Sequence, residues 1–249
     1  MAYRSLAIIG GTGLGALATI SKDDALEVTT PYGSPSARLM KGRLGIRPVT
    51  FLARHGNPHA LLPQEINYRA NIHALVESGC DAIVGVNAVG AIRRDVSSGD
   101  VVVPHDIIDY TYGRKHTFGG DGRVIHVDMT EPYASDLLAA LNQAAGQVAQ
   151  LTVHRDGVYG CTQGPRLETS AEIDRMERDG CDVVGMTGMP EAALAREMGV
   201  GYAAVCLVVN AAAGRAPGPI TLQQIEEVTL TGMEKVEALL THAVESLYK

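Results

Sequence analysis

Uninterrupted apolar runs separated by helical segments constrain the fold of this chain most strongly. The runs at 5–9, 82–86 and 201–209 are apolar at nearly every position instead of alternating with polar residues. Strands of this kind are buried on both faces, as in a largely parallel sheet covered by helices. Helical spacing separates them, at 66–76, 132–148, 170–179, 190–198 and 222–248. We therefore expect an α/β fold with a twisted, mixed, largely parallel central sheet flanked by helices.

The length and charge of the chain narrow the classes of protein further. No long linker or low-complexity stretch interrupts the 249 residues, so we expect a single domain over 1–249. The net charge of −7 and the pI near 5.6 argue against nucleic-acid binding, which needs a basic face. The start of the chain lacks a signal-peptide pattern, and the uncharged run at 198–214 contains three glycines. We expect a cytoplasmic protein that binds no membrane.

Cysteine and histidine spacing gives no sign of a metal or of hydrolytic chemistry. The four cysteines form no CxxC pair and have apolar neighbours, so we expect buried, reduced thiols. The histidines have no metal-ligand spacing among themselves or with carboxylates, and no G-x-S-x-G elbow is present. The sequence predicts no metal site and no organic cofactor.

A glycine-rich loop at 10–15 directly follows the first apolar strand. Its backbone N–H groups, together with the hydroxyl of Thr12, are suited to bind an anion. The loop also partly matches a dinucleotide fingerprint, but the apolar stretch after it is too short for the expected helix. Glu27 comes earlier in the chain than the acidic residue that binds the ribose in that fingerprint. A dinucleotide-dependent dehydrogenase is therefore a weaker alternative, and a non-catalytic nucleoside-binding module is another.

Polar residues follow several other expected strands, where ligands of α/β sheets bind. Arg54 and His55 follow one strand, and a guanidinium there suits bidentate binding of an oxyanion. Either residue alone would favour a surface ion pair or a cap, but with Thr12 and Thr187 an oxyanion site is the better interpretation. Glu168 before a helix and Asn210 after a strand are equally consistent with structural roles and with ligand contacts.

Taken together, these segments resemble the family of purine nucleoside phosphorylases and methylthioadenosine phosphorylases. The resemblance covers nearly the whole chain, and its motifs are jointly specific although each is short. They are Gly10-Gly-Thr-Gly-Leu14, Arg54-His55-Gly56, Pro63-Gln-Glu-Ile-Asn-Tyr-Arg-Ala-Asn71, Asn87-Ala-Val-Gly90, Gly164-Pro-Arg166 and Gly185-Met-Thr-Gly-Met-Pro-Glu191. The resemblance implies a homotrimeric α/β enzyme of purine salvage. It would cleave a purine N-glycosidic bond with inorganic phosphate as co-substrate.

The same resemblance implies a role for each matching residue. Those expected to hold phosphate are Thr12, Arg54, His55, Ala88 and Thr187, with Asn87 beside them. Met186 would lie under the ribose, and Glu168 and Asn210 would contact the base, with Ala211 and Ala212 nearby. Gln223 falls in the segment that lines the 5′ pocket, and His126 would reach the 5′ pocket of a neighbouring subunit. The residues expected to act in catalysis are Asn210, Glu168 and His55.

Two departures from the methylthioadenosine enzymes bear on the substrate. Those enzymes carry Thr-Asp-Tyr-Asp where this chain has Val209-Asn-Ala-Ala212, and Ser where it has Glu168. The Glu168–Asn210 pair is similar to that of inosine- and guanosine-cleaving relatives, whereas 63–71 and 188–191 resemble the methylthio branch. The expected reaction is phosphorolysis of S-methyl-5′-thioinosine to hypoxanthine and 5-methylthioribose 1-phosphate. A general inosine/guanosine phosphorylase and a methylthioadenosine phosphorylase are the alternatives.

Overall fold

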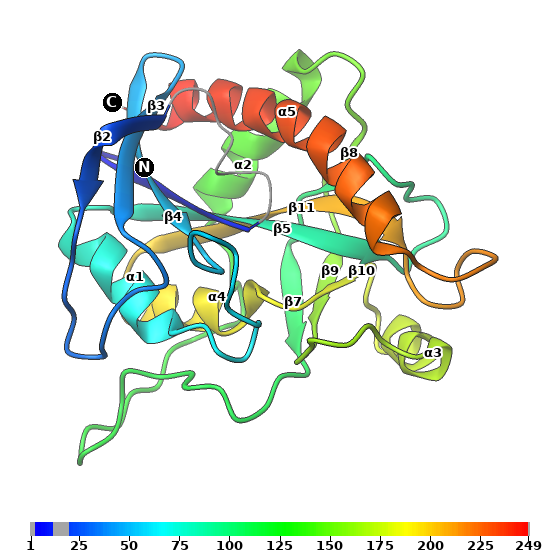
Figure 1. Ribbon diagram of the computed structural model, residues 1–249, viewed down its shortest axis with the longest axis horizontal. Coiled ribbons are helices and arrows are strands. Elements are labelled where there is room, and N and C mark those ends of the chain that lie inside the picture. Colours follow the sequence, from blue (N-terminus) through cyan, green and yellow to red (C-terminus); the bar gives the residue numbers. More distant parts are fainter. Residues whose placement is uncertain (1–2, 12–19, 249) are drawn as a thin grey trace.

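The computed structural model describes residues 3–11 and 20–248, and Figure 1 shows their arrangement. The strands are β1 (Leu6–Gly10), β2 (Ile20–Leu26), β3 (Leu39–Leu44), β4 (Arg47–Ala53), β5 (Ala82–Ala91), β6 (Val101–Val102), β7 (Asp106–Asp109), β8 (Val153–His154), β9 (Val158–Cys161), β10 (Val183–Gly185) and β11 (Gly201–Ala211). The helices are α1 (Tyr68–Glu77), α2 (Ser135–Ala144), α3 (Ser170–Arg178), α4 (Gly188–Glu197) and α5 (Leu222–Leu247), with a 3-10 turn η2 (Ala145–Gln147) after α2.

The strands form one mixed sheet in which β5 is central. β1 lies between β4 and β5 and is parallel to both. β5 also pairs in parallel with β11 and antiparallel with β10, and β9 is parallel to β10 and β7. The antiparallel strands β2 and β3 extend the sheet beyond β4. The expected mixed, largely parallel α/β sheet is confirmed.

Helices cover both faces of the central strands, as the continuous apolar runs predict. In β1, Leu6 and Ile8 belong to an apolar cluster that includes the inner faces of α2 and α5. The alternate residues Ala7 and Ile9 belong to a second cluster with α1 and α4. Figure 1 shows these two helix pairs on opposite sides of the sheet and α3 at one end of the molecule. Because both faces are covered, every residue of β1 is buried.

Two strands extend further than the sequence indicates. The expected strands end before Asn87 and before Asn210, but β5 continues to Ala91 and β11 to Ala211. The two strands pair with each other along nearly their whole length, so ladder hydrogen bonds carry both through the small polar residues. Their register shifts between Val208 and Asn210, which makes Val209 the extra residue of a bulge. The expected helix at 132–148 is shorter, because α2 begins only at Ser135.

All four cysteines are free and buried, so the prediction of reduced thiols is confirmed. Burial raises the pKa of the Cys161 thiol to about 12, which keeps it protonated at neutral pH. Within 3–11 and 20–248, no helix is long and apolar enough to cross a membrane.

Candidate functional site

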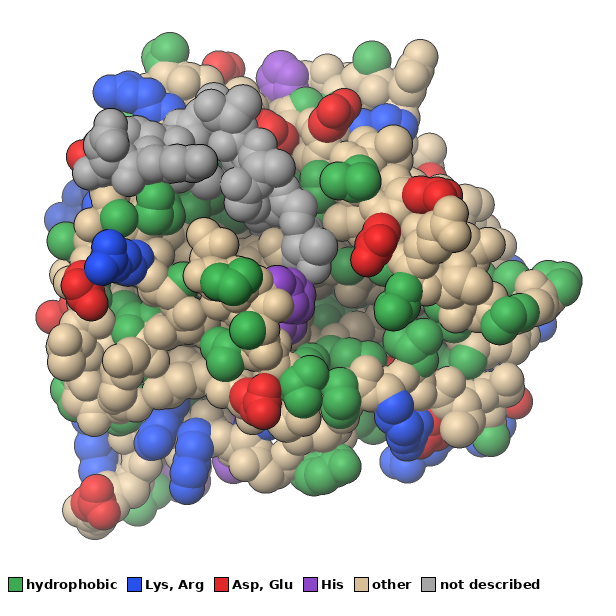
Figure 2. All heavy atoms as spheres, in the orientation of Figure 1, with side chains coloured by type: hydrophobic (Ala, Val, Ile, Leu, Met, Phe, Trp, Pro, Cys, Tyr) green, Lys and Arg blue, Asp and Glu red, His purple; other side chains and the backbone are tan. Residues whose placement is uncertain are grey.

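A cavity of about 210 Å³ opens where β1, β4 and β11 end and where the second half of β5 meets the end of β10. Residues of β5, β10 and β11 line it, together with residues directly after β1 and β4 and with the first half of α5. Figure 2 shows hydrophobic side chains gathered around a hollow near the centre of this face. The carboxyl ends of strands are the usual place for ligands in α/β sheets.

Arg54 lies at the bottom of this cavity and is only 1% exposed. Its Nε and Nη2 donate to the two carboxylate oxygens of Glu191 at 2.6 and 3.0 Å. Its Nη1 and Nη2 also donate to the carbonyl oxygens of Val86 and Ile9. Burial by itself lowers the pKa of Arg54, but the Glu191 carboxylate more than reverses this, so the guanidinium stays charged. Of its five N–H groups, one on Nη1 has no partner among the described residues.

Thr187 and Asn87 form a second polar unit beside Arg54. The hydroxyl of Thr187 donates to Oδ1 of Asn87 at 2.9 Å, and Nδ2 of Asn87 donates to the carbonyl oxygen of Gly85. Thr187 lines the cavity, whereas Asn87 is buried behind it and does not. Ala88 is exposed in a strand whose other residues are buried, because it faces the cavity. The sequence analysis expected Asn87 beside the residues that hold phosphate. In the structure it lies next to Thr187, whose hydroxyl it orients, and it does not line the cavity.

His55 lines the cavity with a defined ring orientation. Its Nδ1 lies 2.8 Å from the carbonyl oxygen of Leu61, which requires a proton on Nδ1. Burial is the main cause that lowers the pKa of His55 to about 4, with the charge of Arg54 acting in the same direction and the hydrogen bond to Leu61 opposing it, so the ring is neutral at pH 7. Nε2 of the neutral ring therefore carries a lone pair. His55 is among the residues expected to hold phosphate, and in this tautomer its Nε2 accepts a hydrogen bond instead of donating one.

Glu168 and Asn210 lie at the other end of the same cavity. The hydroxyl of Thr162 donates to Oε1 of Glu168 at 2.6 Å and leaves Oε2 for a ligand. Nδ2 of Asn210 donates to the carbonyl oxygen of Ala211 at 2.7 Å, which fixes the amide and leaves its second N–H and its Oδ1. The bulge at Val209 shifts Asn210 relative to β5, and this shift places its side chain at the cavity.

The remaining wall is largely apolar. Met186 and Pro63 line the cavity, and Gly164 packs so closely between them that a side chain there would collide with the Met186 sulfur. Gly164 also has a positive φ of 62°, which favours glycine. On the opposite side, Ile220, Ile225 and Met233 line the cavity from α5 and the segment before it. Neither Met233 nor Pro63 was singled out as a site residue from the sequence, because apolar side chains carry no spacing signal of their own.

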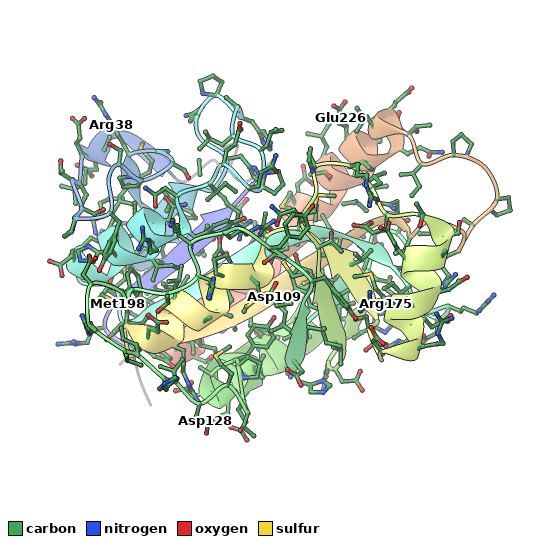
Figure 3. The ribbon with its side chains drawn as sticks, turned by 90° about the horizontal axis from the view of Figure 1, so that it is seen from below. Arg38, Asp109, Asp128, Arg175, Met198 and Glu226 are labelled. Carbon is green, nitrogen blue, oxygen red and sulfur yellow. The ribbon has the colours of Figure 1, made fainter. Side chains whose placement is uncertain are left out.

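Of the other expected residues that the structure describes, only Ala212 lines the cavity of this chain, and the neighbouring Ala211 does not. Gln223 is exposed on α5 and donates to Glu227, and His126 is exposed on the loop between β7 and α2. Figure 3 shows Asp128 of that loop and Glu226 of α5 at opposite edges of the molecule. Thr12 lies outside the described residues.

The model of one protein family, described as the phosphorylase superfamily, matches residues 5–245. The chain belongs to this superfamily. The family expected from the sequence is thereby confirmed, and with it the expectation of an enzyme of the nucleoside phosphorylase type.

Individual members of the superfamily resemble this chain over almost its full length. A probable S-methyl-5′-thioinosine phosphorylase of Pseudomonas syringae pv. tomato is 51% identical, over 96% of this chain and 98% of that protein. A probable 6-oxopurine nucleoside phosphorylase of Dictyoglomus turgidum is 42% identical, over 98% of this chain and 92% of that protein. The structure of methylthioadenosine phosphorylase from Schistosoma mansoni in complex with adenine aligns with a TM-score of 0.92 at 32% identity, covering 98% of this chain and 91% of that one.

Within the described part of the chain, no group of three or more His, Cys, Asp or Glu side chains is placed to hold a metal ion. The polar side-chain groups that the described residues bring to this phosphorylase cavity are instead one guanidinium, one hydroxyl, one amide, one imidazole and one carboxylate. Such a set binds an anion at one end and a hydrogen-bonding heterocycle at the other.

Proposed function

We propose that the protein catalyses the phosphorolysis of S-methyl-5′-thioinosine to hypoxanthine and 5-methylthioribose 1-phosphate. The observation that carries this proposal is the composition of a single cavity. A base-reading pair, Glu168 and Asn210, shares the cavity with Arg54 and with an apolar wall that includes Met233. The 51% identical relative from Pseudomonas syringae, named for this activity, supports the same substrate.

The base end favours a 6-oxopurine. Hypoxanthine presents N1–H, which the free Oε2 of Glu168 accepts, and O6, which the free N–H of Asn210 meets. Adenine presents a bare N1, whose lone pair would face the carboxylate. Leaving such buried polar groups unsatisfied costs about 1–3 kcal/mol per group. Ala212 next to Asn210 offers no side chain that could compensate.

The apolar wall favours a methylthio group at the 5′ end. Ile220 and Ile225 flank Gln223 in the chain and line the cavity, although Gln223 itself does not. A hydroxyl against Ile225 and Met233 would lose hydrogen bonds to water without gaining a partner here, whereas CH₃–S would bury apolar surface.

Phosphate would lie at the end of the cavity opposite the base, against Arg54, His55, Ala88 and Thr187, with Thr12 of the glycine loop as a hydrogen-bond donor. One phosphate oxygen attacks C1′ while the C1′–N9 bond breaks and its electrons move to the purine. Nε2 of neutral His55 accepts a hydrogen bond from a protonated phosphate oxygen. Met186 lies under the ribose, and Asn210 stabilises the departing base, with Glu168 at N1. Fixed donors aimed at developing charge supply most of such catalysis, and in-line positioning adds to it.

Two relatives define the alternatives. The Dictyoglomus turgidum protein is named for 6-oxopurine nucleosides in general, so a broad inosine/guanosine phosphorylase is the nearer one. The Schistosoma mansoni structure is of a methylthioadenosine phosphorylase. The carboxylate of Glu168 and the amide of Asn210 count against adenine, and the apolar wall counts against unmodified inosine.

Our proposal also covers the oligomeric state of the enzyme and its place in the cell. We propose a homotrimer of single-domain chains in which His126 completes the 5′ pocket of a neighbouring subunit. His126 does not line the cavity of its own chain, and its loop lies at the opposite edge of the molecule from α5, which does line that cavity. Both observations support a role for His126 at the cavity of another subunit. The enzyme would act in purine salvage in the cytoplasm, with phosphate as co-substrate and without metal or organic cofactor.

The decisive experiment follows purine release from S-methyl-5′-thioinosine, inosine and methylthioadenosine, each with and without phosphate. We expect rapid phosphate-dependent release of hypoxanthine from the methylthio nucleoside and much slower release from the other two. Equal rates on inosine would establish the broad phosphorylase instead. Preference for methylthioadenosine would show that Glu168 and Asn210 do not select the base.

A further inference from the structure

Arg114 is a buried cation that the function described so far does not use. It lies in the loop between β7 and α2 and is 8% exposed. Its guanidinium makes six hydrogen bonds to acceptors on separate segments of the chain. No carboxylate of the described residues forms an ion pair with it, so carbonyl, amide and phenol oxygens alone satisfy this charge.

The first group of these bonds holds the segment that carries Met186 and Thr187. Nη1 of Arg114 donates to the carbonyl oxygens of Met186 at 2.8 Å and Met189 at 2.6 Å. These two carbonyls bracket Thr187, which lines the cavity together with Met186. The guanidinium therefore holds this short connection between β10 and α4 from the side away from the cavity.

The second group holds the segment that leads to Glu168. Nη2 of Arg114 donates to the carbonyl oxygens of Thr162 and Gln163 at 3.2 and 2.9 Å, and Nε donates to the side chain of Gln163. The hydroxyl of Thr162 in turn donates to Glu168. The carbonyl that Arg114 holds and the hydroxyl that orients the base-reading carboxylate therefore belong to the same residue, Thr162.

A third contact passes through Tyr68 on α1. Nη1 of Arg114 donates to the phenol oxygen of Tyr68 at 3.1 Å, and that phenol donates to the carbonyl oxygen of Pro63 at 2.8 Å. Pro63 lines the cavity and lies against the position of Gly164, as does Met186. The three segments that Arg114 holds therefore meet at one point of the cavity wall.

We propose that Arg114 is a positioning residue, which sets the ribose-side wall at Met186 and the base-reading carboxylate of Glu168 in one fixed arrangement. The proposal rests on the proposed function for the roles of those two residues. A planar guanidinium with five N–H groups can hold several carbonyls in set directions, whereas a lysine ammonium has three donors and no plane. At the phosphate end Arg114 holds only the backbone on either side of Thr187, because Arg54 is anchored separately by Glu191, Val86 and Ile9.

A positioning role and a purely structural role predict different kinetics. If Arg114 only stabilises the fold, its loss lowers the unfolding midpoint and lowers the apparent kcat in proportion to the folded fraction, while both KM values stay unchanged. If it positions the nucleoside end, its loss raises KM for the nucleoside and lowers kcat. KM for phosphate changes much less, because Arg54 and His55 keep their own anchoring contacts. Misplacement of reacting groups by about 1 Å lowers rates by up to about 100-fold.

The experiment compares the wild-type enzyme with Arg114→Lys, Arg114→Met and the milder Tyr68→Phe. The matched control is Arg93→Met, because Arg93 is also partly buried and joins several segments but neither it nor its partners line the cavity. We expect kcat/KM for the nucleoside to fall about 10- to 100-fold in both Arg114 variants and less in Tyr68→Phe. KM for phosphate should change less than about threefold.

Three outcomes would overturn the positioning role. These are full activity in Arg114→Lys, an equal rise in both KM values, and the same kinetic pattern in Arg93→Met. The constants are measured with the purine nucleoside that the wild-type enzyme cleaves fastest. Failure of the proposed substrate then shows in the wild type, and failure of the positioning role shows only in the variants.

Discussion

Arg54 and Glu191 form a completely buried ion pair at the bottom of the phosphorylase cavity, with Nε–Oε1 and Nη2–Oε2 distances of 2.6 and 3.0 Å. The phenol of Tyr202 donates to the same carboxylate at 2.8 Å. The pair has no net charge, so a phosphate ion arriving here meets one remaining N–H of Arg54 and the dipoles of its neighbours instead of a free cation. Glu191 thereby fixes the direction of that N–H.

Removing Glu191 alone should destabilise the protein strongly. Glu191→Ala leaves the charge of Arg54 buried and unpaired, which lowers the free energy of unfolding by about 3–5 kcal/mol. Tyr202→Phe, which removes one hydrogen bond to the same carboxylate, should lower it by about 1–3 kcal/mol. Urea unfolding followed by circular dichroism measures both. An equal, small effect of the two variants would show that the ion pair contributes little.

Replacing both members of the pair should separate stability from activity. Arg54→Met combined with Glu191→Leu leaves no buried charge and should be more stable than Glu191→Ala. The same double variant lacks the guanidinium N–H at the cavity, so we expect phosphate-dependent turnover to fall at least about 100-fold. Steady-state kinetics at varied phosphate, with the Arg93→Met variant as control, tests this. Turnover within a few-fold of wild type would remove Arg54 from the phosphate site.

Stability should decrease in mildly acidic solution because of His55. Its pKa falls from 6.5 in the unfolded chain to about 4 in the fold, mainly through burial. Between these values the unfolded state binds more protons, so the contribution is complete above pH 6.5 and is lost as pH falls toward 4. With discounting for partial exposure, we expect about 1–2 kcal/mol. The pH dependence of urea unfolding should flatten in His55→Gln but not in the exposed control His116→Gln.

Asn210 should determine which purine leaves. In Asn210→Asp the carboxylate repels O6 of hypoxanthine and accepts from the amino group of adenine. We expect the ratio of hypoxanthine to adenine release to drop roughly tenfold or more. Competition between S-methyl-5′-thioinosine and methylthioadenosine measures this ratio directly. Asn142→Asp on α2 adds the same charge away from the cavity, and an equal change in that variant would point to a general charge effect.

The apolar wall should determine the preference at the 5′ end. Met233→Gln places an amide where the methylthio group is proposed to lie and should raise KM for S-methyl-5′-thioinosine roughly tenfold or more. KM for inosine, which carries a hydroxyl at that position, should change little or fall. Met198→Gln at the end of α4, outside the cavity, is the matched control. A parallel rise of KM for both nucleosides in Met233→Gln would place Met233 away from the 5′ end.

Much of the fold follows from local patterns in the chain. The continuous apolar run at β1 predicted a strand buried on both faces. Apolar residues at helical spacing predicted the long helix α5, because a helix that packs along one stripe repeats its apolar residues every three to four positions. Of the expected site residues, Arg54, Glu168, Met186, Thr187 and Asn210 do line one cavity. Strand-end position indicated an oxyanion site with Arg54 and Thr187, and the family resemblance implied the grouping of Glu168, Met186 and Asn210 with them. The binding roles of all five stay predictions.

Other features depend on contacts between distant parts of the chain. The sequence does not reveal that Glu191 neutralises Arg54, that Asn87 lies behind Thr187, or that the proton of His55 is on Nδ1, because each needs a partner brought near by folding. The bulge at Val209 has no local signature and arises from the register of β11 on β5.

The amino-acid sequence by itself determined the elements of this phosphorylase and the kinds of chemical group at its strand ends, because hydrophobic period and residue type are local properties. Only the tertiary structure decided how those groups are charged and aimed. Arg114 is the clearest case. In the sequence it is one basic residue of a polar loop, and in the fold it is a buried cation that joins three segments of the cavity wall. Its partners are separated from it by up to 75 residues, and only packing brings their carbonyl oxygens within reach of one guanidinium.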